Sequence, residues 1–107
     1  MKADALKGQL ELLVLATLRN GPLHGYAIIK DIRERSGGDL NVLEGTLYPA
    51  LHRLEGLGLV GSRWTTGAGR RRRLYELTKK GRGALAAQES EWRSFARTVD
   101  LILGGAR

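Results

Sequence analysis

The sequence contains no cysteine, which excludes disulfide bonds and thiolate metal ligands. Its two histidines, His24 and His52, are too few for a zinc site unless carboxylates take part, so we expect no structural metal and no cofactor. Near the N-terminus the longest apolar run, residues 12–16, is too short for a signal peptide or a membrane span. We therefore expect a cytoplasmic protein with no membrane partner.

Proline, serine and glutamine are scarce, so the chain lacks the composition of a disordered protein. Its 107 residues, 42% of them apolar, suffice for one domain with a modest core and a short appendage. The acids are scattered, no metal-ligand spacing joins them to the histidines, and no nucleophile is paired with a base. An enzyme is therefore the class that the sequence favours least, and we do not expect one.

Positive charge is what the sequence has in excess, and it is concentrated in one segment. The formal net charge is +7; residues 61–83 hold eight Lys or Arg and one acid, Glu76, while the rest of the chain nets zero. Such a localised excess indicates an anion-binding face. Nucleic acid is the first candidate partner; taken alone, the charge would also suit, in second place, an anionic membrane surface or an acidic protein.

Apolar periodicity predicts three short helices in the first half of the chain. The first covers residues 6–18 and ends before Gly21-Pro22. The second is stopped by Ser36-Gly37-Gly38, and the third begins near Glu44 and closes at Gly56-Leu57-Gly58. The expected apolar faces are formed by Tyr26, Ile29 and Ile32 in the second helix and by Leu47, Leu51 and Leu54 in the third.

The second half of the chain changes period. Residues 59–64 and 71–77 are strand-like, and the polar, glycine-rich residues 65–70 link them, which predicts a β-hairpin. Thr78 is the predicted N-cap of a long helix over residues 79–103.

This order of elements is typical of a winged helix-turn-helix, in which the hairpin is the wing. The predicted fold class is mainly α with a small β-hairpin (α+β). We assign residues 1–78 to a winged helix-turn-helix DNA-binding domain and residues 79–107 to a C-terminal dimerisation helix. The basic residues 63–73 would form the wing.

The third predicted helix keeps one face free of the core and would be the recognition helix. Tyr48, His52 and Arg53 can donate hydrogen bonds to phosphates or base edges. Gly45 and Thr46 at its start allow close backbone approach to a phosphate. The candidate DNA-binding residues of this helix are Thr46, Tyr48, Pro49, His52 and Arg53. The alternative is that Tyr48 covers the core and His52 is a solvated surface residue.

The run of arginines at residues 70–73, next to the turn at residues 67–69, is the strongest electrostatic signal. Alternate side chains of a strand face opposite ways, so about half of them can address one phosphate track. We select Arg70, Arg71 and Arg73 as DNA contacts, and binding should then weaken steeply with salt. The alternative is a solvated charge run at a hairpin tip.

The last helix would be roughly 37 Å long, too long to bury its apolar stripe on a domain of this size. Leu85, Trp92 and Val99 are seven residues apart, as are Phe95 and Ile102, which is the spacing of a coiled-coil seam. We therefore expect a homodimer that binds a palindromic operator in double-stranded DNA. Trp92 and Phe95 could also line a pocket between the two subunits for a small aromatic or hydrophobic effector, or they could be ordinary interface packing.

Three motifs occur in order along the chain: residues 21–26 (GPLHGY), residues 44–55 (EGTLYPALHRLE) and residues 71–78 (RRRLYELT). In order and spacing they resemble the PadR family of bacterial transcriptional regulators, over nearly the whole chain. The resemblance implies a winged helix, a single C-terminal dimerisation helix as in the smaller members, and repression of a nearby promoter relieved by a small molecule. It gives Tyr48 and the wing arginines the DNA-contacting roles. Leu43 stands where members often have a capping Ser or Thr, so Asn41 or phosphate-bound amides would replace that cap.

Two hypotheses from different classes follow. The first is a homodimeric, sequence-specific regulator of transcription, acting as a repressor. The second is a winged-helix protein-interaction adaptor whose basic wing binds an acidic partner without specific DNA binding.

Overall fold

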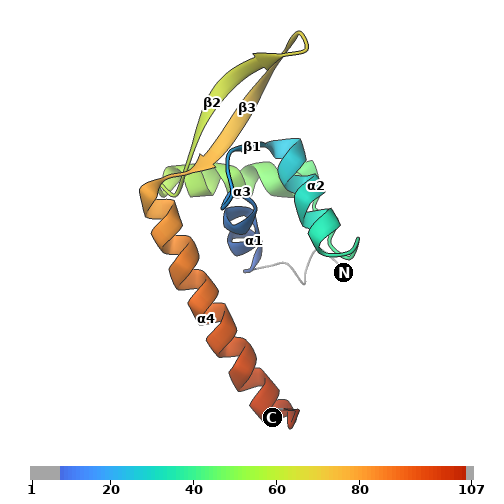
Figure 1. The fold of residues 1–107 in the computed structure, drawn as a ribbon, viewed down its shortest axis with the longest axis vertical. Helices are drawn as coiled ribbons and strands as arrows, with labels where there is room; N and C mark the ends of the chain where they lie inside the picture. Colours follow the sequence, from blue (N-terminus) through green and yellow to red (C-terminus); the bar gives the residue numbers. More distant parts are fainter. Residues whose placement is uncertain (1–7, 106–107) are drawn as a thin grey trace.

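The computed structural model describes residues 8–105, which form an α+β winged helix with four helices and a three-stranded antiparallel sheet (Figure 1). This confirms the fold class predicted from the sequence. The elements in chain order are α1 (Leu10–Thr17), β1 (Leu23–His24), α2 (Gly25–Arg35), α3 (Glu44–Gly56), β2 (Val60–Gly67), β3 (Arg70–Leu77) and α4 (Lys79–Leu103). Leu6 and Lys7, at the start of the predicted first helix, lie outside the described residues, and Gly8 and Gln9 precede α1.

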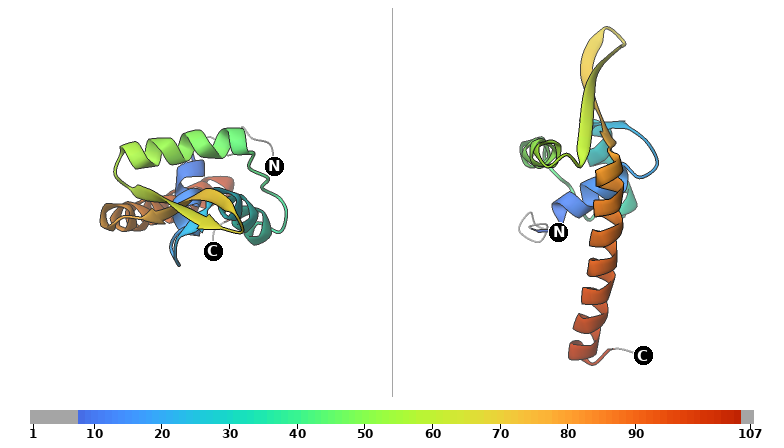
Figure 2. Two further views of the ribbon diagram at one scale, coloured as in Figure 1. Left: turned by 90° about the horizontal axis from the view of Figure 1, so that it is seen from above. Right: turned by 90° about the vertical axis from the view of Figure 1, so that its left-hand side faces the viewer.

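The molecule is elongated, with principal extents of 55 × 29 × 21 Å. Helices α1 to α3 pack together in the middle, the β2–β3 hairpin projects from one end, and α4 extends toward the other (Figures 1 and 2). The hairpin and α4 are neighbours in sequence, yet they point in opposite directions from the body.

The core lies between α1, α2 and α3 and continues under the base of the sheet. Leu47, Leu51 and Leu54 of α3 are almost fully buried, as predicted. In α2 the buried residues are Ile28, Ile29 and Ile32. The expectation that Tyr26 belongs to this face is wrong: the residue is 62% exposed, because a position two residues before Ile28 lies on nearly the opposite face of the helix.

The sheet contains a strand that the sequence analysis missed. Strand β1 pairs with β3, Leu23 opposite Tyr75 and His24 opposite Leu74, so the strand order is β1-β3-β2. A strand of two residues is too short to show the alternation that predicts strands from sequence. Its pairing with β3 is what defines it as a strand.

The hairpin is longer and tighter than predicted. Thr65 and Thr66 continue β2, and Arg70 already belongs to β3. Ala68 and Gly69 form the turn, both with positive φ (52° and 74°). Two consecutive left-handed residues twist a hairpin in the same sense as its strands. The arginines therefore stand in the strand and not in a loose tip.

Helix α4 is fixed at its start by contacts with the turn between α3 and β2. The Thr78 hydroxyl accepts a hydrogen bond from the Gly81 amide at 2.9 Å, which confirms the predicted N-cap. Thr78 Oγ1 and Lys80 Nζ also donate to carbonyl oxygens within residues 57–59, at 2.6 and 2.9 Å. A Cβ on Gly81 would lie 1.9 Å from the Leu59 carbonyl oxygen, so only glycine allows this approach.

Candidate nucleic-acid interface

The outer face of α3 carries all five residues predicted to contact DNA. Thr46, Tyr48, Pro49, His52 and Arg53 are all exposed. The helix begins after Leu43, whose side chain makes no capping hydrogen bond. Asn41 does not replace the cap among the described contacts; its side-chain amide donates instead to the Gly38 carbonyl at 3.0 Å. A helix start without a side-chain cap has backbone amides available to an anion.

Tyr48 joins α3 to the start of α2 while keeping part of its ring at the surface. A Cβ on Gly25 would lie 2.4 Å from Tyr48 Oη and 2.9 Å from the ring edge, so the ring lies directly over the first residue of α2. The Tyr48 residue is nevertheless 41% exposed. It therefore packs between the two helices of the helix-turn-helix and also presents a hydrogen-bonding edge.

Arg53 is held toward α1. Its Nε lies 2.9 Å from Oε2 of Glu11, and both side chains are partly exposed. An exposed pair of this kind is worth little to stability, about 0–1 kcal/mol. Arg53 can therefore exchange Glu11 for a phosphate at small cost.

The hairpin has two faces, and the predicted arginines divide between them. The register places Trp64 opposite Arg73 and Thr66 opposite Arg71, and directly opposed residues share a face of a sheet. Arg71 and Arg73 therefore share one face with Trp64, while Arg70, beside the turn, lies on the other face. Of the three arginines selected from the sequence, the structure brings two together.

Arg73 connects this face of the hairpin to the end of α3. Its Nε donates to Ser62 Oγ at 2.9 Å, and its guanidinium lies 3.8 Å from the carboxylate of Glu55. Ser62 Oγ in turn donates to Glu55 at 2.6 Å. Sequence reasoning missed Glu55 and Ser62, because their pairing depends on how the hairpin folds back on α3.

Tyr75 lies beneath this network and is buried. Burial, followed by the negative charge of Glu55, raises the pKa of the Tyr75 hydroxyl above its usual value. The phenol is therefore neutral throughout the physiological range.

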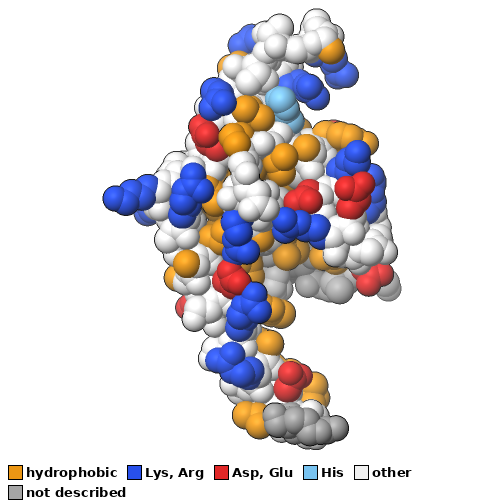
Figure 3. All heavy atoms as spheres, in the orientation of Figure 1, with side chains coloured by type: hydrophobic (Ala, Val, Ile, Leu, Met, Phe, Trp, Pro, Cys, Tyr) orange, Lys and Arg blue, Asp and Glu red, His pale blue; other side chains and the backbone are white. Residues whose placement is uncertain are grey.

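Positive charge dominates the projecting hairpin. Figure 3 shows Lys and Arg side chains over the hairpin and further Lys and Arg side chains along α4. One acid of the hairpin, Glu76, is paired with Arg63 at 3.0 Å. The localised positive surface expected from the sequence is present.

The predicted seam residues of α4 differ in exposure. Trp92, Phe95 and Ile102 are 45%, 59% and 79% exposed, and Val99 is half-buried. The rings of Trp92 and Phe95 lie 6.3 Å apart. Leu85 is 4% exposed and packs in the core of its own chain, so it has little surface left for a partner.

A groove of about 790 Å³ runs between α1 and α4. Its apolar walls include Leu12, Leu13, Ala16, Leu40, Leu85 and Trp92. Phe95 does not line this groove, although its ring lies beside that of Trp92. At the α1 end, Arg19 pairs with Glu89 of α4. Hydrogen bonding from Arg93, followed by the charge of Arg19, lowers the pKa of Glu89.

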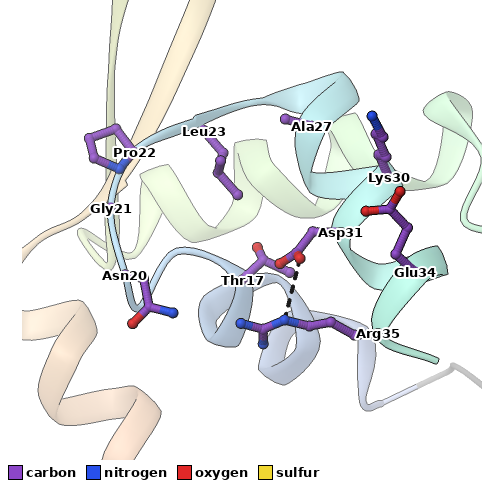
Figure 4. A pocket seen from close by; sticks show the side chains of 10 residues that line it. All are labelled: Thr17, Asn20, Gly21, Pro22, Leu23, Ala27, Lys30, Asp31, Glu34 and Arg35. Carbon is purple, nitrogen blue, oxygen red and sulfur yellow. Dashed lines mark ion pairs between the residues drawn. The ribbon is translucent and has the colours of Figure 1, made fainter. Parts of the chain in front are cut away.

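A second hollow, of about 380 Å³, lies between the end of α1, β1 and α2 (Figure 4). Its rim carries charges of both signs, with Asp31 and Arg35 paired at 3.3 Å. It contains none of the residues selected from the sequence. Within residues 8–105 no cluster of His, Asp and Glu could hold a metal ion. In the same part of the chain, each helix is too short or too polar to span a bilayer.

The family model described as the transcriptional regulator PadR-like family matches residues 14–87. The chain belongs to this family. The matched residues of this PadR-like chain run from α1 into α4 and so include α3 and the whole hairpin.

Relatives of this PadR-like protein include a curated regulator and solved structures. Transcriptional regulator Rv3488 of Mycobacterium tuberculosis is 36% identical over 99 residues, 92% of this chain and 87% of that protein. A solved transcriptional regulator from Clostridium thermocellum has a TM-score of 0.84 at 28% identity, covering 94% of this chain and 95% of that one. Bacillus subtilis PadR, solved with operator DNA, has a TM-score of 0.68 at 29% identity, covering 76% of this chain and 46% of that one.

Proposed function

We propose that this PadR-like regulator binds a specific operator in double-stranded DNA and represses transcription. The observation that carries the proposal is the uncovered face of α3 next to a hairpin face that carries Arg71 and Arg73. An α-helix fits the major groove, where base edges differ, and arginines on a wing can bind the flanking phosphates. The solved complex of Bacillus subtilis PadR with operator DNA supports this use of the fold.

The two parts of the interface would have different tasks. Tyr48, His52 and Arg53 face outward from α3 and would supply sequence preference, with Thr46 and Pro49 fitting the start of the helix against the backbone. Arg70 and Arg71 of the hairpin would supply affinity without sequence preference, because they meet phosphates. Arg73 already has a partner on α3, Glu55, so its contribution depends on that anchoring.

The protein would act as a homodimer on a palindromic operator. Helix α4 extends beyond the body, and Trp92, Phe95, Val99 and Ile102 recur along it at heptad spacing. A second copy packed against this stripe would cover it. Two recognition helices related by a two-fold axis can then reach successive major grooves.

The groove between α1 and α4 would be the place for a small aromatic or hydrophobic effector. Trp92 offers a flat ring on its wall, and the remaining lining is largely aliphatic. The dye ANS is a suitable probe: its fluorescence should rise in the native protein and rise less in Trp92→Leu. Trp64→Leu, on the hairpin, is the matched control and should behave as the native protein does.

Fluorescence anisotropy tests DNA binding directly. A duplex from the region upstream of the chain's own gene should bind at least about 1,000-fold more tightly than a shuffled duplex of the same composition. Tyr48→Ala should lose much of this preference, and Arg71→Ala should weaken both duplexes and reduce the salt slope by roughly 0.9. Arg35→Ala, at the far end of α2, removes the same charge and is the control. Equal affinity for both duplexes would favour the protein-interaction adaptor instead.

A further inference from the structure

An exposed tryptophan stands in the hairpin among the arginines. Trp64 is 52% exposed on β2, directly opposite Arg73 on β3. The hairpin projects from the body (Figure 1), and none of its residues from 61 to 74 belongs to the hydrophobic core. The indole therefore contributes little to packing, and its neighbours indicate what it does.

Two guanidinium groups lie over the Trp64 ring. The central carbon of Arg71 is 4.5 Å from the ring centroid and that of Arg73 is 5.1 Å from it. Both distances lie within the roughly 6 Å at which a cation is attracted to an aromatic face, and tryptophan is the strongest partner of this kind. Arg72 lies between them in sequence but on the opposite face of the strand.

One of the two arginines also has polar partners. Arg73 donates to Ser62 and lies beside Glu55 at the end of α3. A continuous series of contacts thus runs from Glu55 through Arg73 and Trp64 to Arg71. It reaches from the recognition helix into the outer half of the hairpin.

We propose that Trp64, Arg71 and Arg73 form one phosphate-binding unit, in which Arg73 is the anchor, Trp64 is a positioning residue and Arg71 binds a DNA phosphate. The unit rests on the proposed DNA-binding function and adds Trp64 to it. A guanidinium stacks through its flat face and donates hydrogen bonds from its edge, so Arg71 can remain on the indole while it binds. Holding a long side chain in place before binding reduces the entropy lost on binding.

The proposal separates Arg71 from its neighbours in the run. Arg70 and Arg72, on the other face, have no aromatic ring to order them among the described contacts, and they would bind a phosphate with greater loss of freedom. A lysine at position 71 would keep the charge but would lose the planar stack.

A double-mutant cycle on a shuffled duplex measures this coupling without requiring the operator. Trp64→Leu leaves the charge unchanged and should weaken binding about 3- to 10-fold, as should Arg71→Lys. In the double variant the two losses should not multiply, since each change breaks the same stack. Trp64→Phe keeps an aromatic face and should stay within about 3-fold of the native affinity. Arg72→Lys, combined with Trp64→Leu, is the matched pair and should be additive.

The outcomes are separable. Additive losses in Trp64→Leu and Arg71→Lys, or equal losses in the Leu and Phe variants, would overturn the stacked unit while leaving DNA binding intact. Native protein that binds shuffled duplex but shows no preference for the upstream fragment would refute the proposed specificity alone. Native protein that binds no duplex would overturn both proposals.

Discussion

At the scale of single residues, Gly25 and Tyr48 depend on each other. The sequence places them in separate motifs, and the fold lays the Tyr48 ring over the Cα of Gly25. A side chain at position 25 would take the space of the ring that we assign to base or phosphate contact. Glycine is needed here for close approach and not for an unusual backbone angle.

Gly25→Ala should therefore lower DNA affinity through Tyr48. The added methyl group would displace the ring, and we expect a loss of about 1–2 kcal/mol in unfolding free energy, typical of a small steric change in a packed site. Urea denaturation and anisotropy check the two effects. In the Tyr48→Ala background the same glycine change should cost much less, because the clash is gone. Equal cost in both backgrounds would contradict this account.

Tyr75 gives a pH-dependent prediction. Its pKa is raised in the folded state, so the unfolded chain loses the phenol proton first as pH rises. The stability that depends on the neutral phenol is present below about pH 10 and declines as pH rises further. Above that pH, the free energy of unfolding of Tyr75→Phe should decline less steeply with pH than that of the native protein. If unfolding free energy fell equally with pH in both proteins, ionisation of Tyr75 would not contribute to the pH dependence of stability.

At the scale of elements, the start of α4 sets its direction relative to α3. Thr78 and Lys80 bind the carbonyl groups of the α3–β2 turn, and Gly81 lies against the Leu59 carbonyl. Thr78 could be chosen as a cap from sequence because a cap is local chemistry. The role of Gly81 could not, since it depends on a carbonyl from another element.

Gly81→Ala should be strongly destabilising. A Cβ 1.9 Å from a backbone oxygen cannot be relieved by a side-chain rotation, so α4 must move or unfold. We expect a loss of about 3 kcal/mol or more in the free energy of unfolding, measured by urea denaturation. Gly83→Ala, two residues on, meets no atom within 4 Å and should stabilise the helix by about 0.5–1 kcal/mol. If the two variants behaved alike, the close approach would not be what requires glycine.

In the hairpin, the strands could be predicted from sequence but their register could not. Alternation in residues 71–77 was enough to predict β3, and the arginine run was enough to predict a basic wing. Which arginines share a face with Trp64 depends on the register between β2 and β3. Likewise β1 exists only as a partner of β3, and no local pattern marks it.

At the scale of the whole molecule, the long axis separates the hairpin from the free end of α4 (Figure 2). The heptad spacing along α4 predicted a stripe for a second copy, and Trp92, Phe95 and Ile102 are exposed along it. The same spacing misassigned Leu85, because the first turns of α4 pack on the chain's own core. Heptad spacing alone does not indicate which part of a helix packs on its own chain and which part packs on a partner.

Trp92→Asp should give a monomer. In the proposed interface the carboxylate would be buried without a partner. The free energy of removing it from water would exceed the free energy that such an interface gains on association. Sedimentation velocity should show a halved mass, and operator affinity should fall at least about 10-fold because only a half-site is bound. Ser90→Asp adds the same charge to an exposed position outside the seam and should leave the dimer intact. An unchanged dimer in Trp92→Asp would refute the proposed seam.

The sequence by itself determined the periodicity of each longer element, the cap at Thr78 and the concentration of positive charge in one segment, because each depends on residues close together in the chain. The tertiary structure decided that Leu85 is buried within its own chain and that Tyr48 lies over Gly25. It also decided that Arg71 and Arg73, but not Arg70, lie over the Trp64 ring. These relations join residues that are distant in sequence. They follow from strand register and helix packing, which local patterns do not specify.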